Sequence, residues 1–446
     1  MIRLPAVLRI AVFLAFGVGV VLIFHLITDP IEGTRKLINL HPLAPENNIN
    51  LAPENNINLP DAFDFPPLDS EAIRSICADT QWNPALVFTC SESVGGIGNI
   101  RNSILNCVRF AISAGAALVE PTIVLRNDAD SAEIRTGVKA DMGYMLDPAH
   151  FRESLRLSCP GMKVYDRVED LKATAFHDPI SLLPETLEEK VPATGLKYPE
   201  KWRESFDTWL GQHVGPLPEG TVIVNLQRSY LIYPIYSDGE NFALAFGKLL
   251  KFRADTRILA TKTLLALAAN ASYTTDVSQP ILPDFFFGVH LRTEHDAQLG
   301  WPAADWVYGR YETQAKFYLK QVLASGLKRV YIASGDQDEV AKFAQEAIEK
   351  DISALTKFDV LNAEDVAQLT AMSWDQQGMV DFLVMLRASR FVGVGHSSFA
   401  WNIALVRHDF AQQKDHLRGP HLLNDELSDV YGYPKQYPEY ASCLWP

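Results

Sequence analysis

The sequence predicts an α/β fold in which two lobes are each built on a parallel sheet, and two observations lead to this prediction. Short apolar runs alternate with stretches of helical period in two separate parts of the 446-residue chain, which is the order of βαβ units. Hydrophobic residues make up 48% of the chain and charged residues 21%. A chain of this length and composition can bury two cores and is not disordered.

The first α/β series begins near residue 85. Its apolar runs are short and are separated by a glycine-rich loop at 95–99, as expected for buried parallel strands. The stretch 128–278 holds Pro-rich loops and a few apolar segments, such as 221–225 and 242–250, without a clear pattern. The elements predicted in this series are a strand over 85–89, a helix over 100–114 and a strand over 117–125.

The second series begins near residue 285 and shows a clearer alternation of apolar runs and helical periods. The predicted strands are 285–292, 329–334, 358–361 and 391–394, and the predicted helices are 304–325, 336–351, 377–389 and 397–410. In a two-lobed fold of this kind, the cleft between the lobes is the expected ligand site.

The N-terminal segment predicts a transmembrane anchor. Arg3 and Arg9 precede an uncharged run over 10–27, and Asp29 follows it. The run is long enough to cross a bilayer with help from tilt or flanking residues, and the charges place the N-terminus in the cytosol. A cleaved signal peptide is the alternative, although no small-x-small cleavage motif follows the run.

A stem is predicted after the anchor. The octapeptide LAPENNIN occurs twice in tandem, at 43–50 and 51–58, and its Asn and Pro content without apolar periodicity is typical of a linker. Two copies are too few for a solenoid. The predicted division is a cytosolic tail over 1–9, an anchor over 10–27, a stem over 28–78, a first lobe over 79–280 and a second lobe over 281–446.

Charge and cysteine content narrow the function classes. The 40 Lys and Arg residues against 54 Asp and Glu residues give a net charge of −14. This charge would repel the phosphates of a nucleic acid, so no nucleic-acid partner is expected. Five cysteines suit a large lumenal domain with one or two disulfides and at least one unpaired cysteine, and the sequon at Asn270 agrees with that location.

The first candidate site is the end of the predicted strand over 285–292. Alternation along a strand places His290 and Arg292 on one face, at the carboxyl end where open parallel sheets bind ligands. A guanidinium there can hold a diphosphate and stabilise a departing anion. The alternative is an ion pair with Glu294 or Asp296 that closes the loop.

A metal site in the same segment is a third interpretation, because His290, Glu294, His295 and Asp296 are all possible ligands. Their spacing matches no helical zinc motif, and Arg292 beside them would raise the cost of binding a divalent cation. We therefore predict no metal ligand here.

The second candidate site follows the predicted strand over 391–394. Ser397 is suited to an N-cap, and a helix start after glycines presents free N–H groups to an anion. Ordinary helix capping is the alternative. A hydrolase nucleophile elbow is excluded, because Phe399 stands where that motif needs Gly and too few residues follow for its Asp and His.

The third candidate site is the glycine-rich loop at 95–99, with Glu120 at the next predicted strand, 22 residues beyond Gly98. This pattern approaches a dinucleotide fingerprint, but Arg101 replaces the third glycine, and no Gly-Lys-Ser/Thr follows to make a Walker loop. The missing third glycine leaves nicotinamide or flavin binding as a weak alternative. The other interpretations are a tight turn, or a loop that presents its backbone and the Asn99 amide to the cleft.

Together, the three segments resemble the GDP-fucose-dependent protein O-fucosyltransferases and the related α1,6-fucosyltransferases. The resemblance lies in content and in order: Gly96 to Asn99 in the first lobe, His290 to Arg292 at the start of the second, and Asp381 to Phe399 near the end, with Arg407 beyond. The stretch 128–278 matches nothing in this pattern.

The resemblance implies a GT-B fold with two Rossmann-like lobes, and an inverting transfer of fucose from GDP-fucose to a protein or glycan without a metal or other cofactor. It implies that Arg292 holds the β-phosphate and stabilises the departing GDP, with His290 beside it. The other implied donor contacts are Ser397, Ser398, Phe399 and Asp336, and the implied acceptor-side residues are Gly96, Gly98 and Asn99.

The general base stays open between Glu92 and Glu294, since a carboxylate usually takes the acceptor proton and both residues are equally suited to loop salt bridges. The alternative function is a catalytically inactive, lectin-like or nucleotide-sugar-binding protein of the same fold. Together with the anchor, the resemblance implies a single-pass type II protein of the Golgi or endoplasmic reticulum membrane with a lumenal catalytic domain.

Overall fold

The protein is described by a computed structural model over residues 61–446, except for 128, 172–177, 215–219, 275, 303, 305, 414–421 and 434–436. The predicted anchor over 10–27, the tandem octapeptide and the stem up to residue 60 lie outside the described residues. No helix within the described part of the chain has the length and apolar character needed to span a bilayer.

Two five-stranded sheets organise the chain, and every strand pair in both is parallel. The first sheet has the order β5-β2-β1-β7-β6, with β1 Leu86–Thr89, β2 Ala117–Val119, β5 Val164–Tyr165, β6 Ile180–Leu182 and β7 Val222–Leu226. The second has the order β10-β9-β8-β11-β12, with β8 Phe287–His290, β9 Arg329–Ala333, β10 Ser353–Leu355, β11 Arg390–Val394 and β12 Ser428–Tyr431. The predicted α/β fold with parallel sheets is confirmed.

Helices connect these strands. The first lobe, which is built on the first sheet, contains α2 Glu71–Ala78, α3 Ile97–Ala114, α4 Pro148–Ser158, α5 Trp202–Val214 and α6 Glu240–Phe246, and a small antiparallel pair of β3 Ile123–Val124 and β4 Lys139–Ala140. Between the lobes in sequence lies α7 Ala254–Asn270. The second lobe contains α8 His295–Gly300, α9 Tyr311–Ser325, α10 Gln337–Ile348, α11 Lys357–Val360, α12 Ala363–Thr370, α13 Trp374–Leu386, α14 Ser398–His408 and α15 Pro438–Cys443.

Short 3-10 helices complete the described elements. They cover Met142–Tyr144, Val168–Asp170, Pro184–Leu187, Pro199–Lys201, Ile235–Asp238, Gly247–Leu249 and Val307–Gly309. The apolar segment over 242–250 therefore forms α6 and a 3-10 turn rather than a strand.

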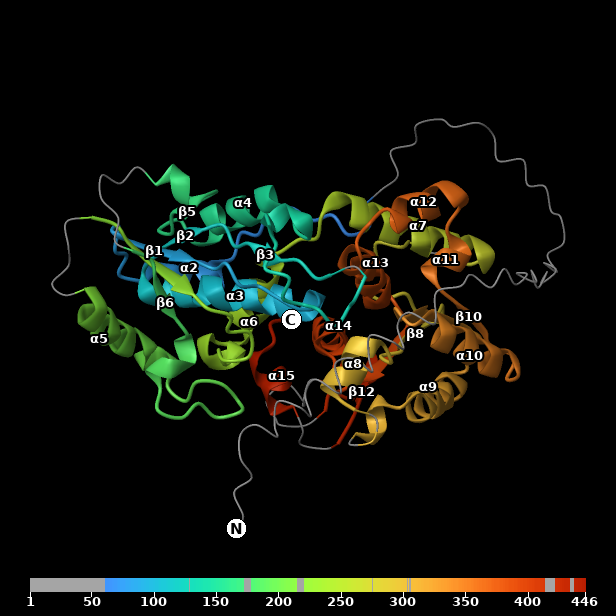
Figure 1. Cartoon of the computed structure of the whole chain (residues 1–446). Coiled ribbons are helices and arrows are strands. Elements are labelled where there is room, and N and C mark those ends of the chain that lie inside the picture. The colour runs from blue at the N-terminus through green and yellow to red at the C-terminus, as the bar shows by residue number, and fades with distance from the viewer. Residues whose placement is uncertain are drawn as a thin grey trace, which may run out of the picture. The chain divides into compact units, whose positions relative to one another are not determined.

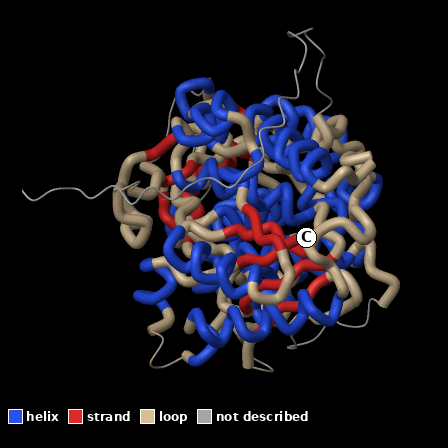
Figure 2. Tube along the Cα trace, turned by 90° about the vertical axis from the view of Figure 1, so that its right-hand side faces the viewer, coloured by secondary structure: helices blue, strands red, loops and turns tan. Residues whose placement is uncertain are grey.

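The second sheet is buried on both faces (Figure 1). Val289, Ile332 and Val392 belong to a core with α9 and α10. Tyr331 and Phe391, which alternate with them along the strands, belong to the large core that includes α13 and α14. Figure 2 shows helices around the strands in a view turned by 90°. Burial on both faces explains the nearly continuous apolar runs of these strands.

The two lobes share helices across the sequence boundary. Helix α7, which precedes the second sheet, packs against α13 of the second lobe. In return, the C-terminal end reaches the first lobe, where the ring of Trp445 lies 4.5 Å from that of Phe246 and its Nε1 donates to Asn106 Oδ1 at 2.9 Å. The predicted boundary at residue 280 therefore separates the sheets but not the layers of helices that cover them.

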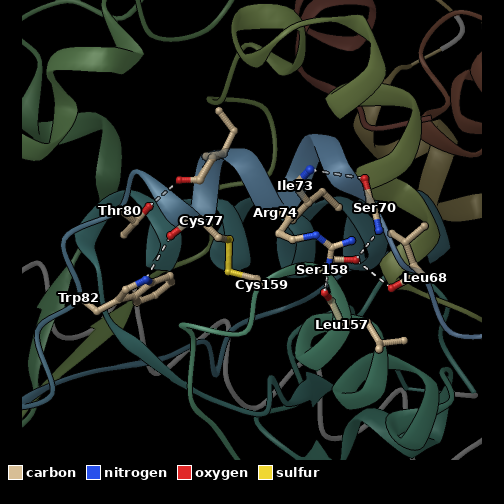
Figure 3. The surroundings of a disulfide bond; sticks show 11 residues. Leu68, Ser70, Ile73, Arg74, Cys77, Thr80, Trp82, Leu157, Ser158 and Cys159 are labelled. Carbon is tan, nitrogen blue, oxygen red and sulfur yellow. Dashed lines mark hydrogen bonds between the residues drawn. A yellow bond between two sulfur atoms is a disulfide. The ribbon is translucent and has the colours of Figure 1, made fainter.

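The predicted stem over 28–78 is too long, because its described end is part of the first lobe. Helix α2 begins after Ser70, whose backbone N–H donates to Ser158 Oγ at 3.0 Å. A disulfide joins Cys77 to Cys159 (Figure 3). The prediction missed this because the residues that hold α2, Ser158 at the end of α4 and Cys159 directly after it, lie far along the chain.

Two predicted strands have different bounds or a different structure. The segment over 358–361 is not a strand: β10 precedes it, and a capping box between Thr356 and Asp359 starts α11 there. The run over 117–125 splits into β2 and β3 around Pro121, which has no N–H to continue a strand ladder.

The cysteines form two disulfides and leave one free thiol, in agreement with the number of bridges predicted. Besides the disulfide on α2, Cys90 after β1 is joined to Cys107 of α3. Cys443 is free and buried. The second bridge ties the first strand to the helix that follows it, and so fixes the loop between them.

Candidate active site

The candidate site lies at the switch point of the second sheet. From β8 the chain passes to β9 and β10 on one side and returns through β11 to the other side of β8. The loops after β8 and β11 then separate at the carboxyl edge, where open α/β sheets bind ligands. A cavity of about 470 Å³ opens there. Its lining includes all three candidate segments: Gly95, Gly96, Ile97, Gly98, Asn99, His290, Arg292, Glu294, Asp296, His396, Ser397, Ser398 and Phe399.

Arg292 lines this cavity and is also paired with two carboxylates. Its Nη1 donates to Glu294 Oε2 at 2.6 Å and to Asp296 Oδ1 at 2.8 Å, and its Nη2 donates to Asp296 Oδ2 at 2.8 Å. Burial disfavours the charged guanidinium, but the two carboxylates outweigh burial and raise the pKa of Arg292. The ion pair given as the alternative interpretation therefore forms, and the guanidinium also lines the cavity. The diphosphate contact stays a prediction.

The backbone of Arg292 is fixed by α9. Its N–H donates to Gln314 Oε1 at 2.9 Å, and Gln314 Nε2 donates back to the Arg292 carbonyl at 2.9 Å. Glu294 is fixed as well, because its Oε1 accepts from the Gly335 N–H at 2.8 Å. Burial disfavours the carboxylate form of Glu294, yet the positive charge of Arg292 leaves its pKa below the ordinary value. The guanidinium is thus held in place before any ligand arrives.

Arg126 of the first lobe is a second guanidinium in the cavity, and the sequence analysis missed it. Its side chain is nearly buried, with Nη1 3.3 Å from Asp296 Oδ2 and Nε 3.4 Å from Asp375 Oδ1. The guanidinium also lies 4.7 Å from the ring centroid of Trp374. Asp296 therefore bridges an arginine from each lobe. No local pattern marks Arg126, because its partners are far away in sequence.

His290 lines the cavity as a neutral imidazole. Burial lowers the pKa of His290 to about 4, and its ring lies 4.6 Å from that of Phe399. The Nδ1 atom has no hydrogen-bond partner among the described residues. A neutral ring with an unused nitrogen can donate to or accept from a bound ligand.

Because of His290, the protein is expected to become less stable as the pH is lowered. The folded pKa lies below the unfolded value of 6.5, so the unfolded chain binds a proton that the folded chain does not as pH falls from about 6.5 toward 4. The titration of this histidine lowers the free energy of unfolding by up to about 3 kcal/mol over that pH range. Denaturant unfolding at a series of pH values should show that the free energy of unfolding decreases less steeply with falling pH in His290→Gln than in the natural chain. Identical slopes for the two proteins would contradict the assignment.

The glycine loop brings the start of α3 against the start of α14. A Cβ at Gly98 would lie 2.8 Å from the carbonyl and from Oγ of Ser398, so a larger residue cannot occupy this position without displacement. Gly96 caps α3 without a side chain, and Asn99 Oδ1 is buried with no partner among the described residues. The predicted acceptor-side loop therefore faces the second lobe across the cavity.

The start of α14 is a capped helix end that also lines the cavity. Ser397 Oγ accepts from the Ala400 N–H at 3.4 Å, and Ser398 and Phe399 line the cavity at the first turn. The hydroxyl of Ser397 is thus used for capping, as the alternative interpretation proposed. The free N–H groups of the first turn remain suited to an anion.

His396 immediately precedes this helix and was not singled out by the sequence. It lines the cavity, is buried, and neither ring nitrogen has a hydrogen-bond partner among the described residues. Burial holds the pKa of His396 well below its ordinary value.

The remaining cavity charge is an ion pair of Lys357 with Asp381, whose other carboxylate oxygen accepts from the Tyr331 hydroxyl at 2.7 Å.

Three residues singled out earlier do not line the cavity. Asp336 caps α10, where its Oδ1 accepts from the Glu339 N–H at 3.1 Å. Glu92 is exposed. Arg407 is fully buried and donates to backbone carbonyls, among them that of Ala388 at 2.7 Å. Asp336 and Arg407 thus have structural contacts that account for their positions.

No cluster of three or more His, Cys, Asp or Glu side chains suited to a metal ion occurs in the described residues. The carboxylates of Glu294 and Asp296 are both paired with Arg292.

The two sheets and this cavity define a two-lobed α/β protein with a polar ligand cleft at the switch point of its second sheet. No protein-family model matches the chain, and no curated protein does.

Among solved structures, the chain is similar to POFUT1 in complex with GDP, with 14% sequence identity, 79% of this chain and 100% of that chain covered, and a TM-score of 0.43. It is similar to POFUT1 in complex with GDP-fucose at 13% identity over 78% of this chain and 98% of that chain, with a TM-score of 0.44. A mutant of FUT1 from Arabidopsis thaliana in complex with GDP matches at 10% identity over 76% and 72%, with a TM-score of 0.38.

The resemblance to fucosyltransferases predicted from the three motifs is thus found again among solved structures. Because all three TM-scores are below 0.5, these likenesses add no weight to a functional assignment. The function proposed below depends on the residues of the cavity.

Proposed function

We propose that this protein is a GT-B glycosyltransferase that transfers fucose from GDP-fucose to a protein or glycan acceptor, with inversion and without a metal. The observation that carries the proposal is the position of Arg292 at the switch point, in a cavity of about 470 Å³ that also includes the first turn of α14. That volume lies in the range of ordinary small-molecule sites.

In the proposed reaction, the acceptor hydroxyl oxygen attacks the anomeric carbon while the bond from that carbon to the β-phosphate oxygen breaks. The bonding electrons leave with GDP, and Arg292 stabilises the negative charge that develops on the departing phosphate. The free N–H groups at the start of α14 supply a second, uncharged contact to the diphosphate. His290, which is neutral, offers a hydrogen bond without adding charge.

The acceptor proton must pass to a base. Of the two carboxylates predicted for this role, Glu294 lines the cavity and Glu92 does not. Glu294 accepts from Arg292 and from the Gly335 N–H in the unliganded arrangement, so its free lone pairs are few. We favour Glu294 as the base. Its lone pairs become available when a bound diphosphate accepts some of the hydrogen bonds that Arg292 donates to it.

A binding protein without turnover is the second candidate function. The observation in its favour is that Arg292 is already paired with Glu294 and Asp296, so a diphosphate must compete with two carboxylates. Such a protein would bind the nucleotide sugar without releasing GDP.

We also propose that residues 10–27 anchor the chain in the Golgi or endoplasmic reticulum membrane with the catalytic part in the lumen. Two disulfides support an oxidising compartment.

Thermal unfolding of the full-length protein with GDP, GDP-fucose and UDP tests the donor assignment. A ligand at 100 times its Kd stabilises the fold by about 2.7 kcal/mol, so GDP and GDP-fucose should raise the Tm and UDP should not. Release of GDP with added acceptor then separates the enzyme from the binding protein. Stabilisation by UDP alone would contradict the donor assignment.

A further inference from the structure

Aromatic side chains form part of the cavity wall. Trp301, at the end of α8, lines the cavity and is 39% exposed, although it is a large apolar side chain. Its ring lies 5.4 Å from that of Tyr437 and 6.0 Å from that of His396. Behind it, Trp306 supports both, with its ring 5.9 Å from Trp301 and 4.1 Å from His396. An indole held in this way presents a fixed apolar surface to the cavity.

His396 adds hydrogen-bonding atoms to this surface. Its side chain is 7% exposed and lines the cavity, and both of its ring nitrogens lack a partner within the described part of the chain. A buried polar group without a partner is costly, and such groups in native structures commonly await a ligand or water. The imidazole is therefore available to a molecule that enters the cavity.

The side chains of this aromatic surface carry no formal charge. Trp301, His396 and Tyr440 all line the cavity, and the hydroxyl of Tyr440 lies 3.5 Å from the His396 carbonyl. Because burial keeps His396 neutral, none of these side chains offers an ion pair. The charged groups of the lining are paired with one another; they are Arg126, Arg292, Glu294, Asp296, Lys357 and Asp381.

We propose that this surface binds the acceptor, and that the acceptor is a neutral carbohydrate whose sugar ring lies flat on Trp301 while its hydroxyls bond to His396. The C–H face of a sugar ring is attracted to the negative face of an indole, and its hydroxyls need uncharged partners that can both donate and accept. A peptide acceptor with charged side chains would find no ion-pair partner on this surface. This inference rests on the proposed function, since it names the acceptor class of the same site.

The position of the surface agrees with an acceptor site. His396 immediately precedes Ser397 and Ser398 at the start of α14, where the diphosphate is proposed to bind. A sugar held on Trp301 would then have its hydroxyl next to the bond that breaks, which is the alignment that speeds a displacement.

Direct binding of saccharides to the full-length protein tests the inference without requiring turnover. Chitobiose, N-acetyllactosamine, lactose and mannobiose are titrated by calorimetry in the presence and absence of GDP. We expect at least one of them to bind, and Trp301→Ala to weaken that binding by at least tenfold. Trp301→Phe should restore most of it, because a phenyl ring can also stack on a sugar.

Leu299→Ala is the matched control, since Leu299 lies on the same short helix, is 63% exposed and does not line the cavity. It should bind saccharide as the natural chain does. Saccharide binding that is equal in Trp301→Ala and the natural chain would overturn the inference, and so would binding of none of the four sugars. Failure of GDP to bind in the parallel titration would count against the proposed transferase, while Trp301-dependent saccharide binding would still support this surface.

Discussion

Arg292→Ala is expected to lower the rate of GDP release from GDP-fucose by about 10³-fold, the loss seen when a charged stabiliser of a departing phosphate is removed. The physical reason is that the guanidinium supplies both positive charge and two parallel donors at the switch point of the sheet. The measurement is the steady-state rate of GDP release with saturating acceptor. Arg292→Lys should keep part of the rate, because lysine keeps the positive charge but lacks the two parallel N–H donors of the guanidinium.

Stability must be measured alongside that rate. Ala at this position leaves Glu294 and Asp296 buried without their main partner, a change that can destabilise a fold by several kcal/mol. Thermal unfolding shows whether the variant is folded at the assay temperature. Arg156→Ala is a control, since Arg156 is paired with Glu153 on the surface of α4. A folded Arg292→Ala protein with the natural rate would contradict the proposed role.

The double substitution of Cys77 and Cys159 by Ser is expected to lower the free energy of unfolding by about 4.5 kcal/mol. The bridge closes a loop with a sequence separation of 82 residues, and a longer loop loses more entropy in the cross-linked unfolded chain. It also links α2, the first helix of the described residues, to the end of α4. Denaturant unfolding under non-reducing conditions measures the change.

The second disulfide provides the comparison. Cys90 and Cys107 are 17 residues apart, so replacing both by Ser should cost about 3 kcal/mol, which is less than the first pair. Equal or reversed costs for the two double variants would show that chain entropy is not the main contribution of these bridges.

Much of the second lobe could be predicted from its local pattern. Strands buried on both faces gave apolar runs that located β9 and β11 to within one residue at each end. The strand predicted over 285–292 is shorter at both ends, since β8 covers only Phe287–His290 and Arg292 lies beyond it. The strand predicted over 358–361 was wrong, because four apolar and charged residues cannot distinguish a strand from a single helical turn without the capping contact of Thr356. The stem was predicted too long for a similar reason, since α2 depends on a disulfide partner in α4.

The candidate site was only partly predictable. Arg292 was found because it was placed at the end of a buried strand, and its pairing with Glu294 and Asp296 was one of the three interpretations of that segment. Arg126 was missed, because its contact with Asp296 spans 170 positions. His396 lay inside a predicted segment, but its unpaired nitrogens become visible only when the side chains around it are placed.

The order of apolar runs and the polar residues directly after them were sufficient to establish two parallel sheets and an arginine at a strand end. Those features are local: the pleat of a strand and the turn that follows depend on neighbours a few positions away. The tertiary structure alone revealed that Asp296 links an arginine from each lobe and that Trp301 and His396 share a wall of the cavity. These contacts join residues that are distant in sequence, and packing rather than periodicity brings them together.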